Sequence, residues 1–162
     1  MFIALFERNP GTAAPEAASG ERAARGIGTA MALGRIAIGL GLAVAPAPAL
    51  RALGFRRSSP ATTVVARIAG GRDIVLGAVT LLSRDDPERL AAASLANAAV
   101  DAGDALTFAA ALRGEEELHP AALRGVAAAV PAALTGLWVG LSLLAESRRG
   151  RVDRPSAPDA PG

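Results

Sequence analysis

Apolar residues fill four long stretches of the chain, and short charged connectors separate them. The stretches cover residues 26–50, 61–83, 89–112 and 121–145 approximately. Each is long enough to cross a bilayer core, which requires about 20 helical residues. None shows the polar face that a helix on the surface of a soluble protein needs. Because short connectors join antiparallel neighbours, the pattern predicts an all-α fold, a four-helix transmembrane bundle running up-down-up-down.

The two ends of the chain differ from these stretches. Residues 1–25 mix Pro, Gly, Ser and scattered charges, and residues 147–162 are first charged and then rich in Pro. Such composition is typical of segments that bury too little apolar surface to fold. We therefore expect two disordered tails around one helical domain at residues 26–146.

The composition supports helix packing in lipid but is also compatible with one alternative fold. Hydrophobic residues make up 51 % of the chain and aromatic residues only 3 %, so small side chains dominate. Small residues allow the close backbone approach that drives helix association in membranes. However, only 121–145 contains a long run without charge, and a charge at the membrane centre costs about 3 kcal/mol. A soluble, alanine-rich helical bundle is therefore the alternative.

The arginines outside the stretches indicate an orientation. With four crossings, both tails and the connector near residue 86 share one side, and that side carries most of these arginines. The exceptions on the opposite side include Arg51, Arg56 and Arg57. Since positive residues are retained in the cytoplasm, we expect a multi-pass protein of the bacterial inner membrane with both termini cytoplasmic.

Charged residues within the stretches form the candidate site. They are Arg35 in the first stretch, Arg67, Arg72 and Asp73 in the second, and Asp101 and Asp104 in the third. Asn97 extends the face of the third stretch that Asp101 and Asp104 share, because residues three or four apart lie on one side of a helix. Charges inside membranes usually face the bundle interior and pair there.

Depth matching predicts which of these charges meet. In an antiparallel pair, residues equally far from the connector lie at the same depth. This places Arg35 beside Asp73, Arg72 beside Asp101, and Arg67 beside Asp104. The last pair is the weaker one, because Arg67 points about 140° away from Arg72 on a regular helix.

Four glycines are candidates for helix packing. Gly70 and Gly71 lie beside the charges and would give them room, or allow a local distortion of the helix. Gly136 and Gly140 form a pair of small residues four apart, which fits either a dimer face or packing within the bundle.

Several classes of function are excluded. The chain has no Cys and a single His, so no metal site, disulfide or cofactor is predicted. No nucleophile–base pair is visible, which favours a protein that is not an enzyme. No basic stripe interleaved with aromatics suggests nucleic-acid binding. The expected partner is the lipid bilayer, and a homo-oligomer or a membrane partner subunit stays open.

The segments GRIAIGLGLAVAPAPALRALGF, ARIAGGRDIVLG and ANAAVDAGDA carry a resemblance. Over about residues 30–112 the chain is similar to an uncharacterised family of small bacterial four-helix integral membrane proteins, a domain of unknown function, and more loosely to DoxX-like proteins. The resemblance rests on the residues Gly70, Arg72, Asp73, Gly77, Asp101 and Asp104. It implies an integral membrane protein without an established activity. The DoxX likeness would imply a redox or quinone-linked role, without assigning residues.

Three interpretations of the charges follow, and in the third some of the charges face the surface or extend along the helix toward the interface. In the first, a buried Arg/Asp network holds the helices of a membrane protein in register, since buried ion pairs can specify geometry. In the second, Asp101 and Asp104 bind protons or a small ligand in a membrane subunit, which could be associated with a quinone.

Overall fold

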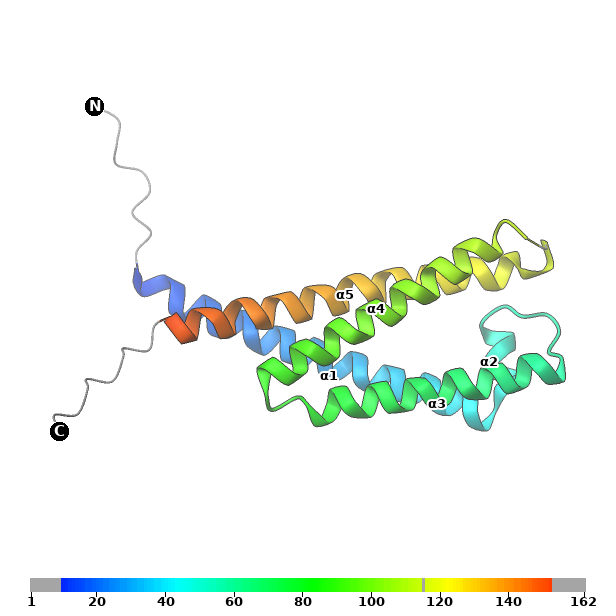
Figure 1. Ribbon diagram of the computed structural model, residues 1–162, viewed down its shortest axis with the longest axis horizontal. Helices are drawn as coiled ribbons and strands as arrows, with labels where there is room; N and C mark the ends of the chain where they lie inside the picture. The colour runs from blue at the N-terminus through cyan, green and yellow to red at the C-terminus, as the bar shows by residue number, and fades with distance from the viewer. Residues whose placement is uncertain (1–9, 115, 153–162) are drawn as a thin grey trace, which may run out of the picture.

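The computed structural model describes residues 10–114 and 116–152, and this part of the chain is helical and contains no strand (Figure 1). Five α-helices follow one another: α1 (Pro10–Val44), α2 (Pro46–Ala52), α3 (Pro60–Leu82), α4 (Pro87–Ala111) and α5 (His119–Val152). A 3₁₀ turn, η1 (Glu116–Leu118), precedes α5. The all-α prediction is confirmed.

Proline and capping residues set where the middle helices begin. Helices α2, α3 and α4 each have Pro in their first turn, where the missing N–H costs nothing. The Ser59 hydroxyl accepts a hydrogen bond from the Thr62 N–H at 3.1 Å and so caps α3. The Asp86 carboxylate accepts from the Glu88 and Arg89 N–H groups at 3.0 and 3.1 Å and caps α4. Both caps satisfy donors that a helix start leaves free.

The first and last helices are longer than the predicted stretches. Helix α1 begins at Pro10, so residues 10–25 of the expected N-terminal tail are helical, and α5 continues to Val152. The remainder of the two expected tails, residues 1–9 and 153–162, lies outside the described residues. The first stretch is also divided, because α1 ends at Val44 and Pro46 begins the separate helix α2.

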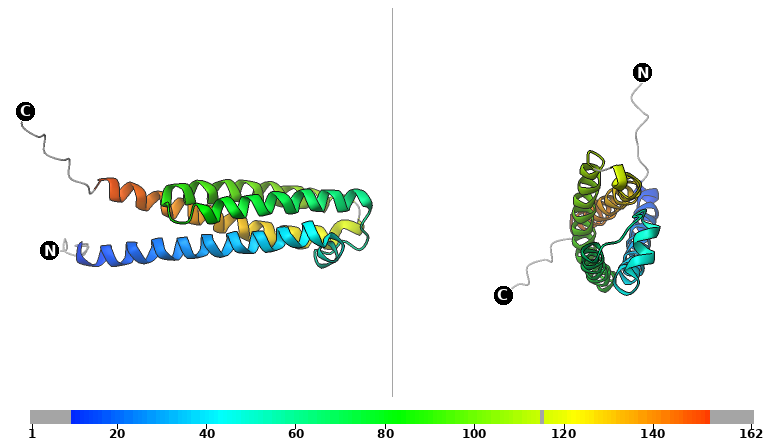
Figure 2. Two further views of the ribbon diagram at one scale, coloured as in Figure 1. Left: turned by 90° about the horizontal axis from the view of Figure 1, so that it is seen from below. Right: turned by 90° about the vertical axis from the view of Figure 1, so that its right-hand side faces the viewer.

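The four long helices form two pairs, which Figures 1 and 2 show from three sides. Helix α1 packs mainly on α3, and α4 packs mainly on α5, whereas the consecutive helices α3 and α4 touch much less. Near the start of α1 the pairs lie together, and from there α3 and α4 diverge (Figure 1). We call these the α1–α3 pair and the α4–α5 pair.

Glycine allows close backbone contact within each pair. A Cβ atom on Gly70 would lie 2.6 Å from the Gly39 carbonyl oxygen, so α1 and α3 touch there through their backbones. Gly136 and Gly140 face α4 in the same way, since a Cβ on either would lie 3.1 Å from a carbonyl oxygen, that of Ser94 or Ala91 respectively. These two glycines thus pack within the fold. Gly71 does not pack, because a Cβ there would meet no heavy atom within 4 Å.

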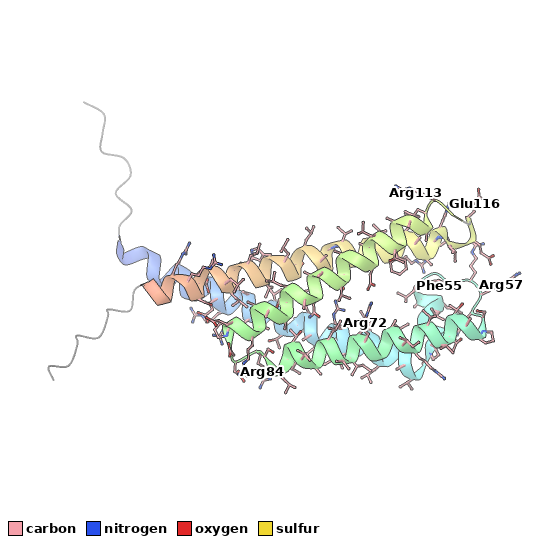
Figure 3. The ribbon with its side chains drawn as sticks, in the orientation of Figure 1. Phe55, Arg57, Arg72, Arg84, Arg113 and Glu116 are labelled. Atoms are coloured by element: carbon pink, nitrogen blue, oxygen red, sulfur yellow. The ribbon has the colours of Figure 1, made fainter. Side chains whose placement is uncertain are left out.

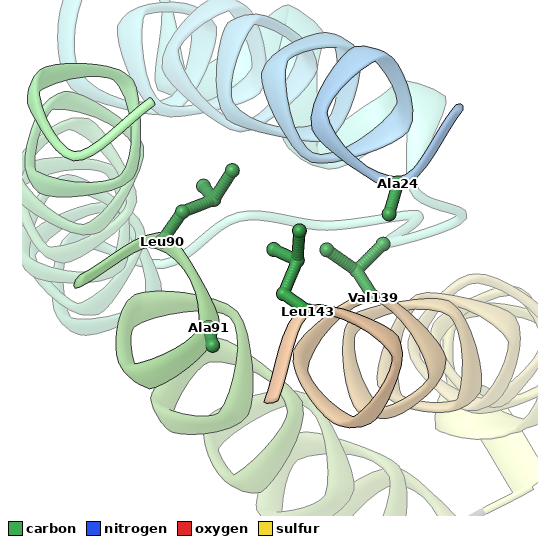
Figure 4. Close-up of a cluster of buried hydrophobic side chains, with 5 residues drawn as sticks. All are labelled: Ala24, Leu90, Ala91, Val139 and Leu143. Atoms are coloured by element: carbon green, nitrogen blue, oxygen red, sulfur yellow. The ribbon is translucent and has the colours of Figure 1, made fainter. Parts of the chain in front are cut away.

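The apolar core is small and lies near one end. Its main cluster joins α1, α4 and α5 and consists of Ala24, Leu90, Ala91, Val139 and Leu143 (Figure 4). A second cluster of Leu42, Leu50 and Ala66 joins α1, α2 and α3. Neither cluster includes the middle of the molecule, where α1 faces both α3 and α4.

The exterior, by contrast, carries many large apolar side chains. Exposed examples on three of the long helices are Leu33, Ile38, Leu40, Val64, Val65, Ile68, Leu134, Leu137 and Leu141. Two described segments, Ser19–Val44 and Glu116–Arg149, are long and apolar enough to cross a membrane. Helix α3 is not one of these two segments, and it carries three charged residues, Arg67, Arg72 and Asp73, within its 23 residues.

Candidate functional site

Arg35 of α1 is the centre of a group of ion pairs in the middle of the molecule. Its Nη1 donates to Asp73 Oδ1 of α3 at 3.0 Å, and its Nη2 donates to Asp101 Oδ1 of α4 at 2.5 Å. The three side chains are only 11 %, 13 % and 8 % exposed. A single guanidinium therefore links both helix pairs.

Arg72 extends this group toward the surface. Its two terminal nitrogens donate to the two carboxylate oxygens of Asp104 at 3.1 and 2.7 Å, the bidentate geometry that Arg and a carboxylate favour. Arg72 Nη2 also lies 3.3 Å from Asp73 Oδ1. Arg72 is 40 % exposed and Asp104 33 % exposed, and Figure 3 shows Arg72 between α3 and α4.

The charges of this group alternate in sign along its length. From the buried end to the exposed end, the order is Asp101, Arg35, Asp73, Arg72 and Asp104. We call these five residues the Arg/Asp network. It joins α1, α3 and α4 in the region that the apolar clusters leave out.

A neutral hydrogen bond supplements the network on the same face of α4. Asn97 Nδ2 donates to Thr80 Oγ1 of α3 at 2.8 Å, and Thr80 Oγ1 donates to the Leu76 carbonyl at 2.9 Å. Since a hydroxyl has one proton, Thr80 must accept from Asn97, which fixes the orientation of the amide. Sequence reasoning missed Thr80, although its depth opposite Asn97 was a usable signal.

Two buried oxygens of this region have no hydrogen-bond partner among the described residues. They are Asn97 Oδ1 and Asp101 Oδ2. The two residues lie one helical turn apart and share a face of α4. Buried acceptors are usually satisfied, so a hydrogen-bond donor from outside the protein would be stabilised here.

The predicted pairings are partly confirmed. Arg35 does pair with Asp73. The prediction of Arg72 with Asp101 is wrong, because Asp101 faces Arg35 and Arg72 instead reaches Asp104. The pairing of Arg67 with Asp104 is also wrong: Arg67 is exposed and forms no ion pair with any described residue. Its position about 140° around α3 from Arg72 turns it away from α4.

The exclusion of Arg67 changes the charge of the site. The Arg/Asp network contains two guanidinium groups and three carboxyl groups, so with all groups ionised it carries one excess negative charge. Within the described residues, no three His, Cys, Asp or Glu side chains form a group that could hold a metal ion. The chemistry of the site is thus that of carboxyl groups and paired arginines.

A family model described as "Domain of unknown function (DUF4267)" matches residues 32–139, about two thirds of the 162 residues. The chain belongs to this family. The DUF4267 region contains the whole Arg/Asp network together with Thr80 and Asn97, so the site belongs to the family domain. The expected membership of an uncharacterised family is confirmed. Neither the curated proteins nor the solved structures contain a match to this DUF4267 chain.

Proposed function

We propose that the protein is an integral, multi-pass protein of the bacterial inner membrane, in which the four long helices form a transmembrane bundle. One observation carries this proposal: large aliphatic side chains cover the outside, and the centre is polar and ion-paired. A soluble protein rarely exposes large contiguous apolar patches. Lipid, in contrast, favours an apolar exterior with charges paired inside.

Helix α3 supports the proposal, although it carries three charged residues. Asp73 is turned inward to Arg35 and Arg72 contacts Asp104, while Val64, Val65 and Ile68 are 56 %, 64 % and 67 % exposed. Two of the three charges of α3, Arg72 and Asp73, therefore have partners of opposite charge, whereas Arg67 is exposed and forms no ion pair with a described residue. Its exposed side retains aliphatic residues suited to lipid.

Within this bundle the Arg/Asp network serves to hold the two helix pairs together. The contact between α3 and α4 is slight, and the main apolar cluster lies toward one end. Arg35 supplies the connection at mid-length, because it binds one carboxylate from each pair. This role requires no catalytic chemistry.

Alkaline carbonate washing of membranes from expressing bacteria tests the membrane assignment. The full chain is expected to stay in the pellet with a known multi-pass protein, while a peripheral protein is released. Reporter fusions at each terminus are expected to indicate a cytoplasmic location for both. Release of the chain into the wash would refute membrane integration, and an external reporter signal would refute the orientation alone.

A second candidate function is a proton or small-ligand site at Asp101 and Asp104. It is favoured by the unpartnered Asp101 Oδ2, by the excess carboxyl group of the network, and by the partial exposure of Asp104. One bound proton would neutralise the network, and the unpartnered oxygen could then carry it as a donor. A small cation or a neutral hydrogen-bond donor would satisfy the same oxygen.

Infrared difference spectroscopy of the purified protein between acidic and alkaline pH tests this candidate. A protonated-carboxyl band that titrates is expected, and D101N or D104N should remove or shift it. D85N is the matched control, because Asp85 is an exposed acid in the connector between α3 and α4. If only the D85N variant alters the band, Asp101 and Asp104 do not exchange protons.

A further inference from the structure

A pocket lined by three arginines lies at the end of the molecule away from the start of α1. Its lining residues are Arg51, Gly54, Phe55, Arg56, Pro120 and Arg124, and its volume is about 380 Å³. It is open on one side and formed where α2 and the connector to α3 meet the start of α5. This volume lies within the range of about 300–1,000 Å³ that small-molecule sites occupy.

Local backbone structure builds this pocket. Gly54 has φ of +100°, a conformation that side chains rarely tolerate, and its position brings the connector against α5. A Cβ on Gly54 would lie 3.0 Å from the Pro120 carbonyl oxygen and 3.1 Å from the Ala121 nitrogen. Arg124 Nη1 donates to the Ala52 carbonyl at 2.9 Å and so fixes α5 to the end of α2.

The electrostatics of the pocket favour an anion. Half of its lining residues are arginines, and none is acidic. Arg51, Arg56 and Arg124 form no ion pair with any described residue, in contrast to Arg35 and Arg72. The pocket also lies at the start of the 34-residue helix α5, whose backbone N–H groups add partial positive charge.

From these observations we propose that the pocket binds a phosphate group, carried either by a phospholipid headgroup or by a free phosphate compound. Guanidinium groups match phosphate oxygens in geometry and charge. Phe55 supplies an apolar wall beside them, as a phosphate ester would require. This assignment is separate from the Arg/Asp network and also gives a reason for arginines on the side where the orientation rule expects fewer.

The chain offers a matched pair of variants for a test. Both Arg56 and its neighbour Arg57 are exposed, but only Arg56 lines the pocket. Figure 3 shows Arg57 at the outer end of the connector. R56Q and R57Q thus remove the same charge from adjacent positions. Arg56 makes no side-chain hydrogen bond to a described residue, so R56Q is expected to fold. R124Q serves as a second pocket variant.

Binding is measured on the full chain in detergent micelles as the rise in unfolding temperature with added probe. The lipid arm compares phosphatidylglycerol with diacylglycerol of the same chains, and the soluble arm compares sodium phosphate with sodium chloride at equal ionic strength. We expect at least one phosphate probe to stabilise the wild type. The dissociation constant should rise about tenfold in R56Q, as loss of one charge-assisted hydrogen bond implies, and stay unchanged in R57Q. In R124Q it should rise at least as much, because this variant also loses the bond to the Ala52 carbonyl.

The probe that stabilises the protein identifies the source of the phosphate group. Stabilisation by phosphatidylglycerol alone assigns a lipid headgroup, and stabilisation by sodium phosphate as well assigns a free phosphate compound. No effect of either phosphate probe would overturn the proposal. An equal loss in R56Q and R57Q would also overturn it, because the binding would then reflect general surface charge. None of these results depends on the Arg/Asp network.

Discussion

Replacing Arg35 with Gln should be among the most damaging single polar changes in the protein. The guanidinium and its two carboxylate partners are at most 13 % exposed, so solvent screens them little. In R35Q, Asp73 still has Arg72 at 3.3 Å, but Asp101 loses its only ion-pair partner among the described residues. Removing one partner of a buried ion pair costs about 3–5 kcal/mol, because the other charge is left buried.

The measured quantity is the free energy of unfolding in mixed detergent micelles. Unfolding is induced by titration with a denaturing detergent and monitored by far-ultraviolet circular dichroism. The double variant R35Q/D101N should recover much of the loss, since it removes the stranded carboxylate. R67Q is the control: Arg67 is exposed and without an ion pair to any described residue, so its change should stay within about 0.5 kcal/mol. A loss in R35Q no larger than that in R67Q, or a double variant R35Q/D101N no more stable than R35Q, would contradict this prediction.

Two further predictions concern coupling and packing. A double-mutant cycle of R72Q and D104N in the same unfolding assay should give a coupling free energy of about 0.5–1 kcal/mol, because the two side chains are 40 % and 33 % exposed and solvent partly screens them. The more deeply buried pair Arg35–Asp101 should couple more strongly. A larger coupling for Arg72 with Asp104 than for Arg35 with Asp101 would contradict this prediction. G70A should destabilise the α1–α3 contact by about 1–3 kcal/mol, since its Cβ would lie 2.6 Å from the Gly39 oxygen. G71A is the control, because a Cβ on Gly71 would meet no heavy atom within 4 Å and alanine has the higher helix propensity. G71A should therefore be neutral or stabilising. Equal losses of stability in G70A and G71A would argue against the backbone contact at Gly70.

The sequence predicted the all-α fold and one of the ion pairs. Depth matching across the first connector found Arg35 with Asp73, because α1 and α3 do pack closely side by side. The same procedure failed across the second connector. Depth matching there requires α3 and α4 to pack side by side, but α4 packs mainly on α5 and makes little contact with α3. Asp101 is thereby turned to Arg35 of α1, and Arg72 reaches Asp104.

Other differences have local causes. A tail before residue 26 was predicted from Gly and Pro residues such as Gly11, Pro15 and Gly20. The alanines, Glu and Arg between them favour helix, however, and α1 begins at Pro10. The pocket of Arg51, Arg56 and Arg124 was invisible in the sequence, because it combines residues about 70 positions apart through the Gly54 turn. Sequence patterns indicate depth and face, whereas tertiary packing decides which faces meet.

The position of Asp73 and Asp101 in the chain bears on how the protein is made. Residues 10–82, which contain α1 and α3, leave the ribosome before α4 does, so Asp73 becomes available to Arg35 before Asp101 does. In the proposed membrane setting, the first helix pair can therefore enter lipid with its central cation already neutralised. Asp101 then arrives with the second pair and finds the Nη2 group of Arg35 still free to donate. The order of translation thus matches the order in which the two bonds of Arg35 can form.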